Sequence, residues 1–308
     1  MYKRVDVRVP ATTANLGPAF DCMGMALDIW NYIRLETGHE GILIYGEGSD
    51  SISVGQDNLV WQAVSRVFGQ VGQEVPRLRI TCRNNIPLAR GLGSSAAAVV
   101  GGLVGGSLLC EGLLDQSQLL SLAAEMEGHA DNVAPALLGG CQIVAQTQSG
   151  WTTSRVPVPE GLRAVLFIPD EQIATAQARA ILPSKVSMED AVHNVGRAAL
   201  LVNALASDHL ELLKLATEDH LHQPARQHLF PAMKSIFKAA LNAGALGVFL
   251  SGAGSTILAL TRGREMTIGY EMADMAEKAG VKGTIRITRP TPLGVQAVDG
   301  EGVDTWQQ

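Results

Sequence analysis

The 308-residue sequence lacks an excess of positive charge and lacks closely paired cysteines. Lys and Arg total 24 against 30 Asp and Glu, which gives a net charge of −6. Because a nucleic-acid surface needs clustered cations to neutralise phosphates, nucleic acid is not an expected partner. The four cysteines form no CxxC pair, which favours free thiols in a reducing cytosol over disulfides or a zinc site.

Long apolar runs are also scarce. Charge interrupts the first ten residues at every second or third position, which excludes the apolar core of a signal peptide. Residues 91–110 carry no charge and have about the length that spans a bilayer. They contain six glycines and three serines and begin like a turn, so they predict a buried helix. We therefore expect a cytoplasmic protein that does not enter a membrane.

The composition, with 46% hydrophobic and 18% charged residues, is typical of a globular chain long enough for two domains. The proline-broken stretch 150–161 predicts a boundary, with domains at 1–155 and 156–308. In the first domain the patterns predict strands near 3–12, 29–36 and 78–84, and helices at 58–70, 94–110 and 116–127.

The second domain is predicted to be a small α+β sandwich. We expect strands at 162–169, 247–261 (broken by a glycine turn) and 283–290, and helices at 175–182, 188–206, 208–218, 231–243 and 265–279. The tail, residues 299–308, is expected to fray.

The stretch PLARGLGSSAAAVVGGL, residues 87–103, holds the main functional signal. A Walker P-loop is excluded because residues 87–110 contain no lysine. Residues 91–96 satisfy the dinucleotide pattern GxGxxA, but no strand runs directly into the first glycine and no second strand follows the helix. What remains is a glycine-serine turn that leads into a helix.

Such a turn predicts an anion site made of backbone. Gly91 and Gly93 permit a tight turn and close approach of a ligand. We expect Ser94 or Ser95 to cap the helix, whose first N–H groups and dipole would face the anion. A capped, buried helix without ligand stays an alternative. The glycines at 101, 102, 105 and 106 cost about 1 kcal/mol each relative to alanine, so we expect unusually close packing around this helix.

Three ordered segments carry a family resemblance. PLARGLGSSAAA resembles the central motif of the GHMP kinases, residues 7–28 resemble their N-terminal motif, and residues 247–260 their C-terminal glycine motif. The segments 11–21, 127–140, 175–183 and 222–231 resemble those of the homoserine kinases, one branch of this superfamily.

The resemblance implies an α+β two-domain GHMP kinase fold, with an N-terminal domain like ribosomal protein S5 domain 2 and a ferredoxin-like C-terminal α/β sandwich. It implies that the ATP γ-phosphate is transferred to the side-chain hydroxyl of L-homoserine, giving O-phospho-L-homoserine for threonine biosynthesis. Magnesium and a homodimer are implied as well.

Residue roles follow from the same resemblance. Ser95 and Glu127 would hold magnesium and, with Thr175 near the γ-phosphate, form the catalytic set; Glu125 is an alternative to Glu127. ATP would contact Asn58 and the loop Pro87, Leu88, Ala89, Arg90, Gly91, Leu92, Gly93, Ser94, Ser95, Ala96 and Ala97. L-Homoserine would contact Asn15, Asp21, His129, Arg179 and Arg226.

The charges of these residues agree with an amino-acid substrate. Asp21 matches an ammonium group, and Arg179 and Arg226 offer the forked geometry that a carboxylate prefers. Phosphoryl transfer depends mainly on positioning, so we do not expect Asp131 to act as a base.

Purely structural explanations of these residues and alternative functions stay open. Asp21 by itself is typical of a loop cap, and isolated arginines are typical of a surface. The alternatives are a GHMP kinase for another alcohol such as mevalonate or a sugar, a nucleotide-binding sensor without catalysis, and a zinc site at His220, His222 and His228.

Overall fold

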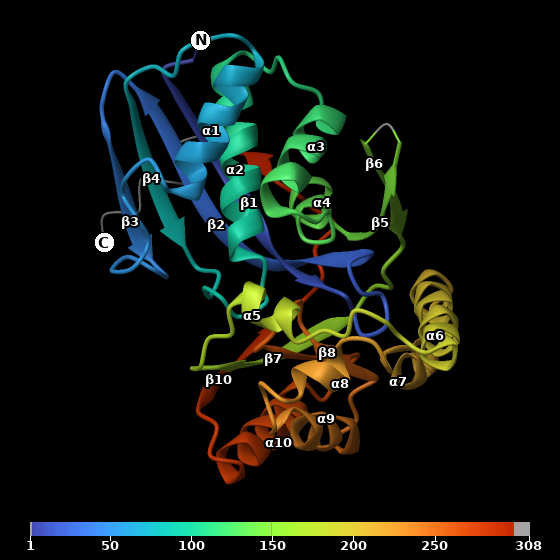
Figure 1. Cartoon of the computed structure of the whole chain (residues 1–308). Helices are drawn as coiled ribbons and strands as arrows, with labels where there is room; N and C mark the ends of the chain where they lie inside the picture. Colours follow the sequence, from blue (N-terminus) through green and yellow to red (C-terminus); the bar gives the residue numbers. More distant parts are fainter. Residues whose placement is uncertain (1, 149, 299–308) are drawn as a thin grey trace.

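The computed structural model describes residues 2–148 and 150–298 and contains two β-sheets, one above the other in Figure 1. The larger sheet has seven strands and the smaller has four. The larger sheet comprises β1 (Arg4–Ala14), β2 (Met23–Thr37), β3 (Gly41–Gly46), β4 (Leu78–Asn84), β5 (Cys141–Thr147), β6 (Gly150–Val156) and β11 (Gln296–Ala297). The smaller sheet comprises β7 (Arg163–Pro169), β8 (Gly247–Leu250), β9 (Ile257–Thr261) and β10 (Gly283–Thr288).

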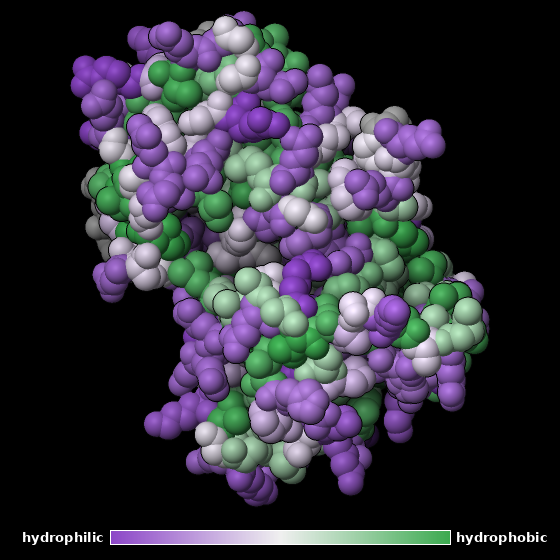
Figure 2. Space-filling model, in the orientation of Figure 1, coloured by the Kyte–Doolittle hydropathy of each residue, from purple (hydrophilic) through white to green (hydrophobic). Residues whose placement is uncertain are grey.

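Helices cover one face of each sheet (Figure 1). The first group is α1 (Leu59–Gln70), α2 (Ser94–Leu109), α3 (Gln116–Glu127) and α4 (Val133–Leu138). The second is α5 (Thr175–Ala180), α6 (Met188–Ala206), η1 (Leu210–Leu212), α7 (Leu213–Ala216), α8 (Gln223–Arg226), α9 (Met233–Asn242) and α10 (Glu265–Lys278). Of these, α9 and α10 pack on the smaller sheet, while α6 lies at the periphery, where Figure 2 shows apolar side chains gathered.

The larger sheet is built on the long antiparallel pair β1 and β2, whose register shifts between Pro10 and Ala11. Beyond the shift, β2 pairs with β5 from Met23 to Met25, whereas its second half pairs with β4. The loop between β1 and β2, residues 15–22, is therefore held at the edge that faces the smaller sheet. This places Asn15 and Asp21 next to elements of the second half.

The smaller sheet has the antiparallel order β10-β7-β9-β8, which is the order of a ferredoxin-like β-α-β-β-α-β frame. After β10 the chain returns to the larger sheet, where β11 pairs with β1 through Val7 and Ala297. Two crossings, after β6 and after β10, thus connect the two sheets.

The element order predicted from the sequence is largely confirmed, with specific differences. The prediction missed β3, α4, the hairpin β5–β6, α8 and β11, and the segment 208–218 splits into η1 and α7. The hairpin has no clear alternation because the outer end of β5, residues 145–147, is exposed on both faces and β6 is mostly exposed or partly buried. Residues 150–156 belong to β6, so the proline-broken linker begins only at residue 157.

Two other expectations concern the chain ends and the uncharged helix. The tail 299–308 lies outside the described residues. Within residues 2–148 and 150–298, none of the helices combines the length and apolar character that crossing a bilayer demands. The uncharged stretch is α2, a helix of 16 residues that is buried along most of its length.

Close packing explains the glycines of α2, as expected. A Cβ built on Gly101 would lie 2.4 Å from Ile33 Cδ1 of the sheet. A Cβ on Gly102 would lie 2.6 Å from Ala63 Cβ and 2.7 Å from the Val60 carbonyl oxygen of α1. Glycine thus lets α2 approach both layers, and it positions the N-terminus of α2 firmly beneath the cavity described below.

The helix packing makes a paired prediction on stability. Gly102→Ala is expected to lower the free energy of unfolding by about 1–3 kcal/mol, because the methyl group meets backbone that cannot yield easily. Gly196→Ala in the middle of α6 has open space around the new methyl and is expected to raise it by about 0.5–1 kcal/mol. Chemical denaturation of both variants measures the difference; equal effects would contradict the packing argument.

Candidate active site

A cavity of about 340 Å³ gathers nearly all of the predicted site residues. It lies where the β1–β2 loop, the N-terminus of α2, the C-terminus of α3, α5, α8 and the β8–β9 turn meet. The predicted residues in its lining are Asn15, Asp21, Pro87, Ala89, Arg90, Gly91, Leu92, Gly93, Ser94, Ser95, Ala96, Glu127, His129, Thr175, Arg179 and Arg226. Asn58, Leu88 and Ala97 are not among its lining residues.

An adjoining cavity of about 320 Å³ accounts for two of those three. Asn58 and Leu88 line it together with apolar side chains such as Ile44, Ile52 and Val60. Asn58 accepts hydrogen bonds from the backbone N–H groups of Val60 (2.9 Å) and Trp61 (3.3 Å), so it caps α1 and shapes this cavity. Ala97 is fully buried within α2.

The glycine loop adopts left-handed backbone at Ala89, Gly91 and Gly93. A Cβ at Gly93 would lie 1.9 Å from Thr12 Oγ1, and one at Gly91 would lie 2.0 Å from the Ser251 carbonyl oxygen. These positions therefore require glycine for both conformation and space. Arg90 fastens the loop to the smaller sheet, since its guanidinium donates to the carbonyl oxygens of Pro169 and Asp170 at 2.6 Å each.

The expected side-chain cap of α2 is wrong. The N-cap residue is Gly93, which carries no side chain, and no side-chain hydrogen bond caps the helix. Because a capping hydroxyl would occupy the first-turn N–H groups, its absence leaves these donors facing the cavity. Together with the helix dipole they form an anion site, which fits a phosphate group.

Ser95 and Glu127 lie together at one side of this anion site. The Ser95 hydroxyl donates a short hydrogen bond to Glu127 Oε1 across the gap between α2 and α3. Glu125 instead pairs with Arg66 Nη2 at 2.8 Å, and both side chains are exposed outside the cavity. A hydroxyl and one carboxylate beside a phosphate position are donors that suit Mg²⁺, which keeps several waters and shares phosphate ligands.

A bidentate ion pair joins two predicted ligands of the amino acid. Arg179 donates to Asp21 from Nη1 (2.9 Å) and from Nη2 (2.8 Å). Asp21 has left-handed backbone, and its N–H donates to Asn15 Oδ1. The Nδ2 atom of the same Asn15 amide donates to the Gly252 carbonyl oxygen, so the β1–β2 loop is tied to the β8–β9 turn.

Arg226 adds a further positive charge to the cavity. It is 3% exposed, and its Nη1 donates to the same Gly252 carbonyl oxygen at 2.9 Å. Burial lowers the pKa of Arg226 to about 10, so the guanidinium remains charged at neutral pH. The ring of Phe20 lies 5.7 Å from the guanidinium carbon of Arg179 and 5.4 Å from that of Arg226.

His129 faces the same space and is influenced by Asp131. Its Nδ1 lies 2.8 Å from Asp131 Oδ1, although the direction of the contact is unfavourable for a hydrogen bond. The neighbouring Asp131 carboxylate raises the pKa of His129, despite the opposing effect of burial. A raised pKa means that the charged imidazolium stabilises the folded state at low pH, and that this contribution is lost as the pH rises through the pKa.

This electrostatic arrangement makes a titration prediction. Asp131→Asn is expected to lower the pKa of His129, because the largest stabilising partner of its charged form is removed. An NMR titration of imidazole-labelled protein measures the shift, with the exposed His39 as internal reference. An unchanged His129 pKa would show that Asp131 does not control the charge.

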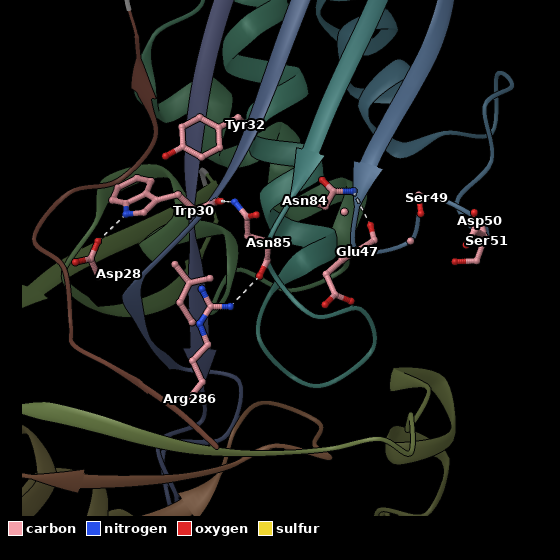
Figure 3. A pocket seen from close by; sticks show the side chains of 13 residues that line it. Asp28, Trp30, Tyr32, Glu47, Ser49, Asp50, Ser51, Asn84, Asn85 and Arg286 are labelled. Atoms are coloured by element: carbon pink, nitrogen blue, oxygen red, sulfur yellow. Dashed lines mark hydrogen bonds between the residues drawn. The ribbon is translucent and has the colours of Figure 1, made fainter. Parts of the chain in front are cut away.

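A larger hollow of about 790 Å³ lies away from these residues (Figure 3). Trp30 and Tyr32 of β2, Glu47 and Arg286 line it, and none of the predicted site residues does. Trp30 already donates to Asp28 and lies against the Arg8 guanidinium. In this hollow Arg286 donates to the Asn85 carbonyl oxygen and Asn85 to that of Trp30. Because the predicted site residues gather instead in the 340 Å³ cavity, we place the chemistry there.

The sequence analysis missed several residues that line the 340 Å³ cavity. Gly252 and Ala253 were recognised only as part of a glycine motif, and Asn132 and Asp131 were given no ligand role. Two of the three histidines of the zinc alternative have separate partners: His222 contacts the Gly17 carbonyl oxygen and His220 stacks on His193. No cluster of three or more metal-type side chains occurs among the residues that the structure describes.

Known proteins match this chain over most of its length. The models of the GHMP kinase N-terminal domain and of the GHMP kinase C-terminal domain match residues 58–140 and 200–268. Homoserine kinase of Moorella thermoacetica is 44% identical over 293 residues, covering 95% of this chain and 99% of that protein. Homoserine kinase of Carboxydothermus hydrogenoformans is 42% identical over 305 residues, covering 97% and 99%.

Solved structures of related proteins share the fold of this chain. The crystal structure of homoserine kinase from Cytophaga hutchinsonii has a TM-score of 0.87 and 29% identity, covering 97% of this chain and 98% of that one. Mevalonate kinase of L. major, at 16% identity and a TM-score of 0.68, shares the fold. The α+β two-domain fold expected from the resemblance is therefore confirmed. By its identity to these relatives over almost its whole length, the chain belongs to the homoserine kinases of the GHMP kinase superfamily.

Proposed function

We propose that this protein transfers the γ-phosphate of ATP to the side-chain hydroxyl of L-homoserine, giving O-phospho-L-homoserine and ADP. One observation carries the proposal: a single cavity has a helix N-terminus free of a side-chain cap at one side and a carboxylate–guanidinium set at the other. The first suits a polyphosphate and the second suits an amino acid. Homoserine is named by the relatives, not by the cavity.

ATP is proposed to lie across the two adjoining cavities. Its phosphates would meet the backbone of residues 91–97 at the start of α2, where the dipole favours negative charge. Its base would enter the apolar cavity lined by Ile44, Ile52 and Leu88, which Asn58 shapes by capping α1. Thr175 lines both cavities and would lie beside the transferred phosphate.

Mg²⁺ is proposed to be held by Ser95 and Glu127 together with phosphate oxygens. When bound, it would neutralise charge on the phosphates. The protein's own part is to hold this hydroxyl and this carboxylate side by side, and the hydrogen bond between them supports the assignment.

L-Homoserine is proposed to bind by exchanging partners with the Asp21–Arg179 ion pair. Its ammonium would take the Asp21 carboxylate, and its carboxylate would take the guanidinium groups of Arg179 and Arg226. An amino acid carries both charges, so the ion pair can open without leaving either residue unpaired. Mevalonate has a carboxylate without an ammonium, and a sugar has neither, so each would leave a charge without a partner.

The phosphoryl transfer itself is proposed to rely on positioning. The hydroxyl oxygen of homoserine forms the new P–O bond as the bond from the γ-phosphorus to the β–γ bridging oxygen breaks, and ADP leaves. The hydroxyl proton is released to water, and no side chain is assigned as its base. His129 and Asn15 would orient the amino acid, and the N–H groups of α2 would receive charge on the phosphate.

The proposal also places the protein in the cytoplasm as a homodimer, without a role for nucleic acid or membranes. The charge balance supports the last point, because the net charge of −6 repels phosphate-rich surfaces.

The test is Mg²⁺-dependent release of ADP from ATP with L-homoserine, D-homoserine, mevalonate or galactose as acceptor. Turnover with L-homoserine is expected to exceed that with each other alcohol. Turnover with mevalonate or galactose instead would support kinase activity but contradict L-homoserine as the substrate. ATP binding without turnover on any acceptor would favour a nucleotide sensor.

A further inference from the structure

A buried imidazole lies directly behind Arg226. His222 precedes α8, is 1% exposed and does not line the cavity. Its Nδ1 lies 3.0 Å from Arg226 Nη1, and its Nε2 lies 2.7 Å from the Gly17 carbonyl oxygen. The ring thus bridges a substrate-facing guanidinium and the loop that carries Asn15 and Asp21.

The chemistry of the two partners determines the protonation of this ring. A guanidinium only donates hydrogen bonds, and a carbonyl oxygen only accepts them. His222 must therefore accept at Nδ1 and donate from Nε2–H, which is the neutral imidazole with its proton on Nε2. Burial favours the same form, since it lowers the pKa of His222 well below its ordinary value.

The surrounding residues hold the ring itself in place. Asp219 is buried and accepts hydrogen bonds from the backbone N–H groups of His222 (3.1 Å) and Gln223 (2.7 Å). Asn194 donates to Asp219 Oδ1 at 2.8 Å and to the Pro18 carbonyl oxygen at 3.0 Å. These bonds link the turn before α8 to the β1–β2 loop.

Arg226 has few other anchors for its orientation. Its Nε donates to the Ala178 carbonyl oxygen at 3.3 Å, and its Nη1 divides its hydrogens between the Gly252 carbonyl oxygen and His222. Without the acceptor on His222, one buried N–H of the guanidinium loses its partner, and the group is free to tilt toward another acceptor. A tilted guanidinium no longer presents its fork to a carboxylate.

We propose that His222 is a positioning residue for the amino-acid subsite: as a neutral Nδ1 acceptor it orients the Arg226 guanidinium toward the substrate carboxylate, and through Gly17 it keeps the ammonium-binding loop in register with it. This inference rests on the proposed function and deepens it, because it adds a residue that acts on substrate affinity without touching substrate.

Two substitutions separate the two bonds of the ring. In His222→Asn the amide oxygen can lie near the position of Nδ1, which preserves an acceptor for Arg226 and loses the bond to Gly17. In His222→Gln the amide nitrogen can lie near the position of Nε2, which preserves the donor to Gly17 and loses the acceptor. Both substitutions remove the imidazole ring, whose centroid lies 5.3 Å from that of the Phe20 ring. Because this packing is lost in both variants, a difference between them reports the hydrogen bonds.

The expected result is a split between the two variants and the two substrates. His222→Gln raises KM for L-homoserine about tenfold or more over wild type. His222→Asn also raises it, but to a KM several-fold lower than that of His222→Gln. KM for ATP stays within about twofold in both, because the nucleotide subsite does not use Arg226. His209→Gln, the same substitution at an exposed histidine of the same half of the chain, leaves both values unchanged.

Each other outcome has a defined meaning. Equal loss of homoserine affinity in both His222 variants, or a parallel rise of KM for ATP, shows that His222 acts through packing, and overturns the assignment. Wild-type KM in His222→Gln overturns it as well. If the wild-type protein does not phosphorylate L-homoserine, the proposed function fails first, and binding of L-homoserine to the same variants, measured by calorimetry, decides the role of His222 separately.

Discussion

Glu127→Gln is expected to lower kcat about 10²–10³-fold, the loss typical of removing one electrostatic partner from a phosphoryl-transfer site. Glu125→Gln, two residues earlier, is expected to leave kcat within about twofold of wild type, because exposed ion pairs such as Glu125–Arg66 contribute little. Steady-state ADP release at saturating ATP and homoserine measures both.

The contrast between the two glutamates is the essential control. Glu127 contacts Ser95 in the cavity, while the Glu125 side chain is 59% exposed outside it. If Glu125→Gln proves the inactive variant, the metal assignment moves to Glu125. The magnesium dependence adds a second readout: in Glu127→Gln the Mg²⁺ concentration for half-maximal rate is expected to rise, since a carboxylate ligand is lost.

The second large effect is expected at the ion pair that homoserine would exchange with. Asp21→Asn should lower kcat/KM for L-homoserine about 10²–10³-fold, because the substrate ammonium and Arg179 both lose their charged partner. Arg179→Gln should cause a loss of similar size for the complementary reason.

The double variant distinguishes exchange from simple loss of contacts. Each single variant is spared the cost of opening the ion pair of the free protein, and the double variant gains that saving only once, so under exchange the combined loss in kcat/KM should exceed the product of the single losses. A fully multiplicative loss would show that the two side chains act independently. KM for ATP serves as the control, because neither residue lies in the adjoining apolar cavity.

Much of the fold was accessible from the sequence because local patterns and packing agreed. The alternation of Val5, Val7 and Val9 marked β1, and the spacing of apolar residues in 58–70 marked α1. The hairpin β5–β6 was missed because residues 145–147 of β5 are exposed on both faces and β6 shows no period-2 burial. The strand β11 has only two residues and forms by pairing with β1 across the whole chain, which no local pattern encodes.

For the site, the sequence by itself determined the chemistry: a lysine-free glycine turn before a helix, an acid for an ammonium and arginines for a carboxylate. It did so because backbone freedom and side-chain charge are properties of single residues. Tertiary structure alone decided which groups converge. Residues 125 and 127 differ by about 200° around α3, so only packing shows that Glu127 faces Ser95 and Glu125 faces Arg66. The same holds for His222, whose role depends on two partners, Gly17 and Arg226, that only the folded chain brings to opposite sides of one ring.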